Sequence, residues 1–327
     1  MKVRCNWLLF SLAALLMTMG CAQNSIMEDI DTHINTDISA DINTNNWYQK
    51  GRQNLMDNRP DLALDAYNKA IELNPKIAEA YNGRGVTYAR LGNRTRAIAD
   101  YDKAIELNPK YAQAYHNRGN AYYKSAEYNQ AIADYSKAIE LNPKIAEAYN
   151  SRGVTYDEMG NDHQAIADYS KAIELNPKIA EAYSNRGYAL YRFGNYHQAI
   201  VDYNEAIALN PMYAEAYHNR GNAYYKSADY NQAIADYNKA IELNPKIAEA
   251  YNSRGVTYDE MGNDNQAIAD YGKAIELNPK YAEAYHNRGI TYSSLGNNNQ
   301  AIADIKKAAR LGLKEAQEYL SKQGIVW

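Results

Sequence analysis

The chain has 327 residues, a formal net charge of −4 at pH 7, and 32 tyrosines against only 2 phenylalanines. A mildly acidic chain without a basic cluster lacks the electrostatic surface that nucleic-acid binding requires, so the sequence argues against a nucleic-acid partner. Both cysteines, Cys5 and Cys21, lie near the N-terminus, which leaves no CxxC pair and no Cys/His cluster for a disulfide framework or a zinc site.

The first residues of the chain have the pattern of a secretory signal peptide. Lys2 and Arg4 form a short positive region, and an apolar run of 13 residues follows from Trp7 to Met19. A helix that spans a bilayer needs about 20 apolar residues, so this run is too short to span one. We therefore predict a signal peptide over residues 1–20.

The end of the apolar run, Thr18-Met19-Gly20-Cys21, resembles the lipobox of bacterial lipoproteins, in which a small residue precedes an acylated cysteine. The resemblance implies that Cys21 becomes the first residue of the mature chain and carries several acyl chains, which anchor it stably. Thr18 departs from the leucine that this family most often has, and an ordinary cleaved signal with an incidental cysteine is the alternative. Ala22 stands where inner-membrane retention would favour aspartate. The resemblance thus implies a lipid-anchored protein of the bacterial cell envelope, at the outer membrane and facing the periplasm.

The segment that follows, residues 21–43, is rich in Asn, Asp, Thr and Ser. These side chains bond to their own backbone and disfavour helix interiors, so the composition favours a flexible tether. Isoleucine recurs there at every fourth residue, namely Ile26, Ile30, Ile34, Ile38 and Ile42. A weakly amphipathic docking helix is therefore the alternative.

The rest of the chain is dominated by a period of 34 residues. Seven of the eight prolines follow an asparagine and recur at that interval: Pro75, Pro109, Pro143, Pro177, Pro211, Pro245 and Pro279. Other positions recur with them, and residues 112–145 have Tyr115, Gly119, Tyr122, Ala131, Tyr135, Ala138 and Pro143 at positions 4, 8, 11, 20, 24, 27 and 32. These units resemble the tetratricopeptide repeat, a helix–turn–helix unit with this period and these signature positions.

The resemblance implies an all-α fold, a right-handed α-solenoid of about eight helix–turn–helix repeats. The predicted repeats are residues 44–77, 78–111, 112–145, 146–179, 180–213, 214–247, 248–281 and 282–315. Positions 4, 8 and 11 share one face of the first helix, and positions 20, 24 and 27 share one face of the second. Residues 316–327 are charged and lack the recurring proline, and we predict that they form a C-terminal capping helix.

Position 15 of the repeat is predicted to end the first helix in a left-handed turn, because five repeats have glycine there. These glycines are Gly92, Gly160, Gly194, Gly262 and Gly296. Ala126 and Ala228 occupy the position in the third and sixth repeats, so we expect those two turns to differ.

Arginine at position 7 and aspartate at position 23 occur together in the second to eighth repeats. A row of arginines is compatible with phosphate binding. An arginine near a packed face needs a partner, however, so the sequence favours structural Arg–Asp pairs.

Catalysis finds little support in the sequence. Residues 111–178 and 213–280 differ at only five of 68 positions, which indicates a duplicated block, and a catalytic motif needs no second copy. No serine or cysteine has a nearby base, and no glycine-rich phosphate loop precedes a helix. Asp157, Glu158 and Asp162 lack the alternating ligands of a calcium loop, which favours a solvated turn. We predict that the protein is not an enzyme and carries no metal or cofactor.

Positions 2, 5, 6, 9, 12 and 13 of the first helices line the concave groove in the tetratricopeptide family, and asparagine and tyrosine are frequent there in this chain. Amides can pair with a peptide backbone, and tyrosines supply flat apolar area with a polar tip. A plain solvated face is the alternative. The predicted partner-binding residues are His116, Asn117, Asn120, Tyr123, Lys124, Asn185, Tyr188, Tyr191, His218, Asn219, Asn222, Tyr225 and Lys226.

The sequence therefore predicts a membrane-anchored scaffold or adaptor that binds proteins or peptides in its groove and assists assembly of an envelope complex. Self-association is also compatible with the repeats. A binder of a non-protein envelope ligand such as a wall glycan, and a regulatory subunit of an envelope enzyme, are the alternatives.

Overall fold

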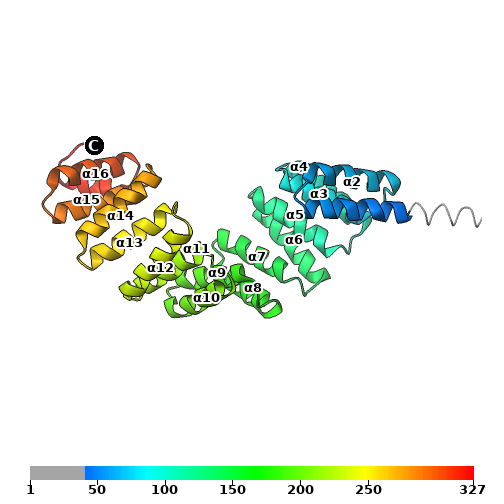
Figure 1. Ribbon diagram of the computed structural model, residues 1–327, viewed down its shortest axis with the longest axis horizontal. Helices are drawn as coiled ribbons and strands as arrows, with labels where there is room; N and C mark the ends of the chain where they lie inside the picture. Colours follow the sequence, from blue (N-terminus) through cyan, green and yellow to red (C-terminus); the bar gives the residue numbers. More distant parts are fainter. Residues whose placement is uncertain (1–40) are drawn as a thin grey trace, which may run out of the picture. The chain divides into compact units, whose positions relative to one another are not determined.

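A computed structural model describes residues 41–327, which form helices without any strand. The described chain divides into two compact units, one ending at Pro143 and the other running from Lys144 to Trp327. The described part of unit 1 opens with helical residues 41–56, and neighbouring helices along the chain pack side by side (Figure 1). Its further helices are α2 (Pro60–Leu73), α3 (Ala78–Arg90), α4 (Arg94–Leu107), α5 (Ala112–Lys124) and α6 (Tyr128–Leu141).

Unit 2 continues the same alternation of a first and a second helix in each repeat. Its helices are α7 (Ala146–Glu158), α8 (Asp162–Leu175), α9 (Ala180–Arg192), α10 (Tyr196–Leu209), α11 (Ala214–Lys226), α12 (Tyr230–Leu243), α13 (Ala248–Glu260), α14 (Asp264–Leu277), α15 (Ala282–Ser294), α16 (Asn298–Arg310) and α17 (Lys314–Lys322). The helix over residues 41–56 pairs with α2, and the last pair is α15 with α16. The predicted all-α repeat fold with a C-terminal helix is confirmed.

The N-terminal predictions fall largely outside the described residues. The signal peptide, Cys21 and most of the tether belong to residues 1–40. The predicted end of the tether at residue 43 is wrong, because residues 41–43 already belong to the first helix. Extending a helix adds one hydrogen bond for each residue fixed, which offsets the weak helix preference of Asp and Asn there. No helix within residues 41–327 combines the length and the apolarity that a membrane crossing requires.

The turns inside the repeats are left-handed at position 15, as predicted for glycine; Gly92, for example, has a φ of 78°. Ala126 and Ala228 adopt the same conformation, with φ of 60° and 59°, so the prediction that their turns differ is wrong. The hydrogen bond that closes the turn is kept, since the amide of Glu127 donates to the carbonyl of Tyr122 at 2.9 Å. This bond holds alanine in a conformation that costs roughly 1–2 kcal/mol.

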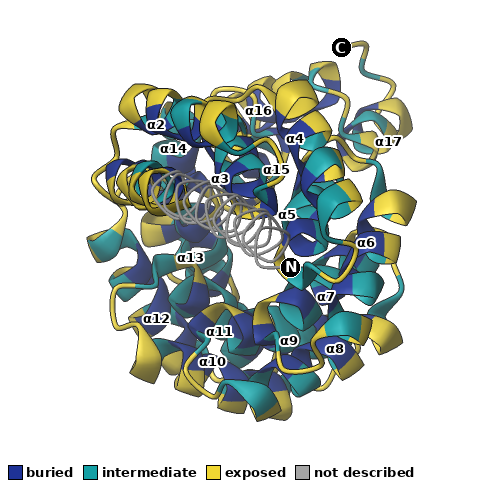
Figure 2. Cartoon of the chain, turned by 90° about the vertical axis from the view of Figure 1, so that its right-hand side faces the viewer, coloured by how far each residue is buried: buried dark blue, intermediate teal, exposed yellow. Residues whose placement is uncertain are grey.

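The interior of each of the first seven repeats is a tyrosine ring packed on a glycine, and in the eighth Ile305 takes the place of the tyrosine. Tyr101 of α4 is 2% exposed, and a Cβ placed on Gly85 of α3 would lie 2.6 Å from its ring. The third repeat has the same contact between Tyr135 and Gly119. A side chain at position 8 would therefore force the two helices apart, which explains why every repeat has glycine there. Buried residues, drawn dark blue, lie where helices face one another (Figure 2).

The predicted Arg–Asp pairs all form, and each links the first helix of a repeat to its second helix. In each pair the guanidinium Nε and Nη2 donate to the two carboxylate oxygens, at 2.6–3.0 Å. The pairs are Arg84–Asp100, Arg118–Asp134, Arg152–Asp168, Arg186–Asp202, Arg220–Asp236, Arg254–Asp270 and Arg288–Asp304.

A third donor of these arginines reaches the preceding repeat. Nη1 of Arg118 donates to Asp102 at 2.6 Å, and Nη1 of Arg220 donates to Asn204 at 2.6 Å. Both acceptors lie at position 25 of the preceding repeat, on the second helix of that repeat. One guanidinium thus joins three helices, so the arginines hold neighbouring repeats in register and are structural rather than phosphate ligands.

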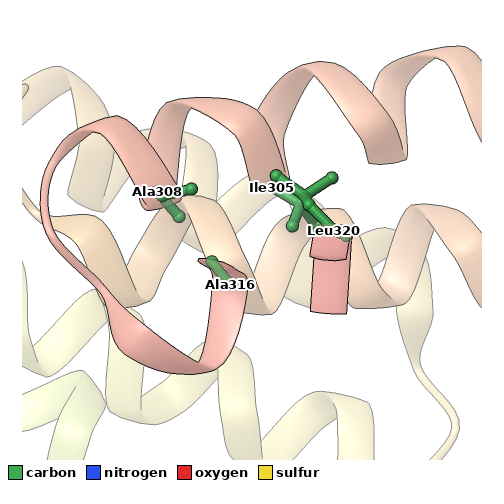
Figure 3. Packing of buried hydrophobic residues seen from close by; sticks show 5 residues of the cluster. Ile305, Ala308, Ala316 and Leu320 are labelled. Carbon is green, nitrogen blue, oxygen red and sulfur yellow. The ribbon is translucent and has the colours of Figure 1, made fainter. Parts of the chain in front are cut away.

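The last helix, α17, covers the end of the stack. Ala316 and Leu320 are fully buried against Ile305 and Ala308 of α16 (Figure 3). The opposite face of α17 carries charged and polar side chains, so the apolar surface of the eighth repeat is closed by a polar outer layer. The helix begins at Lys314, two residues before the predicted start at residue 316.

Candidate functional site: the groove of the first helices

The first helices of successive repeats contact one another within each unit. In unit 1, α3 contacts α5, and in unit 2 the contacts join α7 with α9, α9 with α11, α11 with α13, and α13 with α15. Positions 4, 8 and 11 face the second helices. Positions 2, 5, 6, 9, 12 and 13 of the first helices supply most of the residues that line the two hollows described next.

Unit 1 has a hollow of about 320 Å³ over the buried ring of Tyr101. It is lined by Val86, Ala89, Arg90, Arg94, Tyr101, Asn117, Asn120, Ala121 and Lys124. A second hollow, also of about 320 Å³, shares Val86, Arg90 and Asn117 with the first. It is lined in addition by Tyr48, Arg52, Leu55, Met56, Tyr67, Glu79, Asn82, Gly83 and Gln113. We call the two hollows together the unit-1 groove.

Small side chains create the hollow over Tyr101. Positions 9 and 12 of the second repeat are Val86 and Ala89, which leave the tyrosine ring uncovered on this side. The same positions of the fifth repeat are Tyr188 and Tyr191, and Tyr191 packs on the buried cluster that contains Tyr203. The second and fifth repeats therefore differ in how far the side chains at positions 9 and 12 cover the buried tyrosine.

The rim of the unit-1 groove is positively charged. Arg90, Arg94 and Lys124 are exposed around the hollow over Tyr101, and no carboxylate lines it. The adjoining hollow adds Arg52 and one carboxylate, Glu79. Arg90 is held in place, because its Nη1 donates to the carbonyl of Leu55 at 2.9 Å. The groove combines an apolar floor with a cationic rim.

The floor also has an exposed apolar side chain. Met56, at the C-terminal end of the helix over residues 41–56, is 68% exposed. Methionine is flexible and polarizable and adapts to different apolar partners. Met56 and Leu55 both line the second hollow, so they add apolar surface to the groove.

Several of the asparagine amides predicted to line the groove form hydrogen bonds within the protein. Nδ2 of Asn117 donates to Oδ1 of Asn82 at 2.9 Å, which ties α5 to α3. Asn120 accepts a hydrogen bond from the hydroxyl of Tyr135 at 2.8 Å. In unit 2, Asn185 donates to Asn150 at 3.3 Å. These asparagines therefore brace neighbouring helices as well as line the groove.

Two predicted residues of the third repeat are less accessible than expected. His116 is 7% exposed, and its ring lies 5.7 Å from that of Tyr135. Tyr123 packs on Tyr128 of the following helix with ring centroids 5.8 Å apart. Lys124 is exposed and its Nζ lies 5.5 Å from the ring of Tyr123, so this lysine is the most accessible predicted residue of the repeat.

In unit 2, several of the predicted residues of the sixth repeat make the same contacts as their counterparts in the third. Tyr225 packs on Tyr230 at 5.7 Å, and Lys226 lies over the Tyr225 ring at 5.6 Å. Asn222 accepts from the hydroxyl of Tyr237 at 2.9 Å, and Asn219 is half-buried.

His218 of the same repeat is half-buried. A nitrogen of its ring lies 3.2 Å from the hydroxyl of Ser253. Burial lowers the pKa of His218 to about 4, so the ring is neutral at pH 7. A neutral, half-buried ring serves packing better than it serves recognition of an anionic partner.

Acidic side chains near two turns of unit 2 are bonded to a side chain of the following repeat. Arg192 contacts Asp157 at 2.9 Å and Asp162 at 2.8 Å. In the duplicated block, Asp259 accepts a hydrogen bond from Thr291 at 3.0 Å instead, and burial raises its pKa. Within residues 41–327, no group of three or more His, Cys, Asp and Glu side chains is arranged to hold a metal ion.

Comparison with known sequences decides the family. A profile described as "TPR repeat" matches residues 58–92, 119–160, 188–228, 221–262 and 257–296, which together exceed half of the chain. The chain belongs to the tetratricopeptide repeat family. Further profiles of the same repeat match residues 78–111, 146–179, 100–133, 169–201 and 282–311. Tetratricopeptide repeats are generally non-catalytic and mediate protein–protein interaction. None of the curated protein sequences matches this chain.

Solved structures of tetratricopeptide proteins share the fold. PilF of Pseudomonas aeruginosa is 20% identical, with a TM-score of 0.61 over 65% of this chain and 96% of its own. PilW, a type IV pilus biogenesis factor, is 21% identical, with a TM-score of 0.59 over 64% and 98%. A tetratricopeptide repeat protein of Parabacteroides merdae is 22% identical, with a TM-score of 0.55 over 76% and 98%. At these identities the similarity concerns the fold alone.

The cationic rim was largely missed from the sequence. The predicted residues came from the third, fifth and sixth repeats, which are rich in Asn and Tyr. Arg52 and Arg90 stand at positions 9 and 13 of the first two repeats, which face the groove in the same way. Applying the same positions to every repeat would have found both of them, whereas the hollow itself depends on the packed structure.

Proposed function

We propose that this tetratricopeptide protein is a membrane-anchored adaptor that binds a protein or peptide partner in the unit-1 groove and assists assembly of an envelope complex. One observation carries the proposal: an apolar hollow over Tyr101 is surrounded by Arg90, Arg94 and Lys124 without a carboxylate in its lining. Such a site suits a peptide segment with one apolar anchor and flanking acidic residues.

The energetics of such a complex divide between floor and rim. Burying one large apolar side chain of the partner in a hollow of about 320 Å³ contributes roughly 1.5–3 kcal/mol. The exposed cations contribute less to affinity, but they accelerate association and disfavour cationic partners. Binding is therefore expected to weaken as the salt concentration rises.

Anchoring is proposed from the N-terminal sequence. The apolar run before Cys21 and the lipobox-like Thr18-Met19-Gly20-Cys21 support acylation of the cysteine, and Ala22 supports an outer-membrane location facing the periplasm. Residues 22–40 separate Cys21 from the first described helix, so the unit-1 groove would work within about 60 Å of the membrane surface. Replacement Cys21→Ser should move the protein from the membrane fraction to the soluble fraction or leave it unprocessed. Unchanged fractionation would contradict lipid anchoring.

The groove can be tested with charge reversals on its rim. Full-length protein would be used to capture partners from envelope extract, beside the variant Arg94→Glu/Lys124→Glu. Arg94 is the first residue of α4, where a glutamate is favourable, and both side chains are exposed, so the variant is expected to fold.

The matched control reverses two lysines of the same unit on second helices. Lys103 of α4 and Lys137 of α6 each pair with a glutamate three residues on, and neither lines the groove. A partner retained by the wild type and by Lys103→Glu/Lys137→Glu, but lost from the rim variant, supports the proposal. Equal capture by all three would place binding elsewhere on the protein.

A further inference from the structure

The segment before the first described helix has the chemistry that the unit-1 groove suits. Residues 22–40 contain four carboxylates and no lysine or arginine. The carboxylates are Glu28, Asp29, Asp31 and Asp37, and isoleucines are interspersed at Ile26, Ile30, Ile34 and Ile38. An acidic segment with regularly spaced apolar side chains matches a groove with an apolar floor and a cationic rim.

The segment is long enough to reach the groove. It has 19 residues, which span up to about 60 Å when extended. Tyr48 and Met56 line the groove and lie seven and 15 residues after residue 41 on one helix, a distance of roughly 10–22 Å along its axis. The chain therefore has several times the length that it needs to fold back.

Unit 2 offers a less favourable surface for the same segment. Position 2 of its first helices is an exposed glutamate in every repeat: Glu147, Glu181, Glu215, Glu249 and Glu283. In unit 1, position 2 is Glu79 in the second repeat and the neutral Gln113 in the third, and both line the groove. Like charges would repel the acidic segment from the groove of unit 2.

We propose that residues 22–40 bind in the unit-1 groove of their own chain and compete there with the external partner. This inference rests on the proposed function of the groove. A short linker gives an effective concentration on the order of 1 mM, so a segment with an intrinsic dissociation constant of about 0.1 mM would occupy the groove about nine-tenths of the time. A partner that binds more tightly displaces the segment, which is then free to extend from the membrane.

Proteolysis at Glu28 tests the contact in the intact protein. Glu28 is the only glutamate in residues 22–40, so a glutamate-specific protease reports directly on its accessibility. Detergent-solubilised full-length protein is compared with Arg94→Glu/Lys124→Glu and with the control Lys103→Glu/Lys137→Glu. We expect cleavage after Glu28 to be about 10-fold faster in the rim variant, in proportion to the freed fraction, and unchanged in the control. Equal rates in all three proteins would overturn the proposal.

A peptide-binding measurement tests the competition. The probe is a fluorescent peptide with the sequence of residues 22–40, added to the wild type and to Glu28→Gln/Asp29→Asn/Asp31→Asn/Asp37→Asn. Neutralising the tethered segment should vacate the groove, and the probe should then bind about 10-fold more tightly. Equal affinity for both proteins would show that the segment does not occupy the groove.

The dependence of Glu28 protection on protein concentration distinguishes binding within one chain from binding to a second copy. Protection of Glu28 that is unchanged on 100-fold dilution supports binding within one chain. Protection that disappears on dilution, together with a dimer in sedimentation velocity, would overturn it in favour of exchange between copies.

These outcomes are distinct from a failure of the proposed function. If Glu28 is equally accessible in every variant while the rim variant still loses its captured partner, only the competition is wrong. If the probe binds neither protein and capture is also insensitive to the rim variant, the groove assignment fails as well.

Discussion

Gly272 offers a direct measurement of what the third arginine contact contributes. In unit 2, Arg220 donates Nη1 to Asn204, and Arg254 donates Nη1 to Asn238, in each case at position 25 of the preceding second helix. Arg288 meets Gly272 at that position and has no side-chain acceptor there. The replacement Gly272→Asn should restore the contact between α14 and α15.

The expected gain follows from two contributions. A Cβ at Gly272 would lie 3.5 Å from Nη1 of Arg288, an ordinary contact, so a side chain fits. Alanine in place of this helical glycine should stabilise the protein by about 1 kcal/mol, and asparagine by only about 0.3 kcal/mol through propensity alone. A hydrogen bond to the partly exposed guanidinium should add about 1 kcal/mol, so Gly272→Asn should equal or exceed Gly272→Ala.

Urea unfolding of the wild type, Gly272→Ala and Gly272→Asn measures the three stabilities. Repeat arrays can open locally, so hydrogen exchange of the α14 and α15 amides should accompany the unfolding curves. If Gly272→Asn is less stable than Gly272→Ala by about 0.7 kcal/mol, as propensity alone requires, the third contact contributes nothing and the reasoning is refuted.

Three further predictions concern stability. Arg118→Leu should cost about 3–5 kcal/mol because it leaves the buried Asp134 carboxylate unpaired, and adding Asp134→Leu should recover part of that loss; additive effects in the double-mutant cycle would contradict a coupled pair. Because the pKa of His218 falls to about 4 on folding, the unfolded chain binds its proton first, so stability should decline from about pH 6.5 to pH 4, by up to about 3 kcal/mol. Burial also lowers the pKa of His286, so urea titrations at several pH values should show that His218→Gln makes this decline shallower without removing it, and an unchanged slope would disprove the assignment. Deleting residues 314–327 uncovers Ile305, which is fully buried by α17, and should cause concentration-dependent association; a monodisperse truncation in sedimentation velocity would argue against a capping role.

Much of the fold could be predicted from the sequence because many of the contacts that define a repeat join residues of that same repeat. The glycine at position 8 and the tyrosine at position 24, such as Gly85 and Tyr101, predict close contact between two helices. The shared occurrence of arginine and aspartate at positions 7 and 23 predicts ion pairs, and all of them form. These features depend on contacts within one repeat, where sequence spacing fixes which side chains meet.

The alanine turns show the limit of local reasoning. Residue preference argued that Ala126 would not adopt the left-handed conformation, yet it does. Packing of the flanking helices and the closing hydrogen bond from Glu127 outweigh a local cost of roughly 1–2 kcal/mol.

The candidate site depends on contacts between side chains of different repeats. The sequence does not show which of these side chains bond to each other and which remain available to a partner. The asparagines at positions 6 and 9 looked available to a partner, but Asn117 binds Asn82 and Asn120 binds Tyr135. Their amides found acceptors and donors on neighbouring helices because buried polar groups must be paired.

The sequence by itself determined the repeat, its ion pairs and the presence of a C-terminal helix, because these follow from periodic residue types within a 34-residue template and from the end of that period. Only the tertiary structure decided where a hollow opens and which charges surround it. The reason is that Val86, Ala89 and Tyr101 of one repeat and Lys124 of the next form one site only when two repeats are stacked.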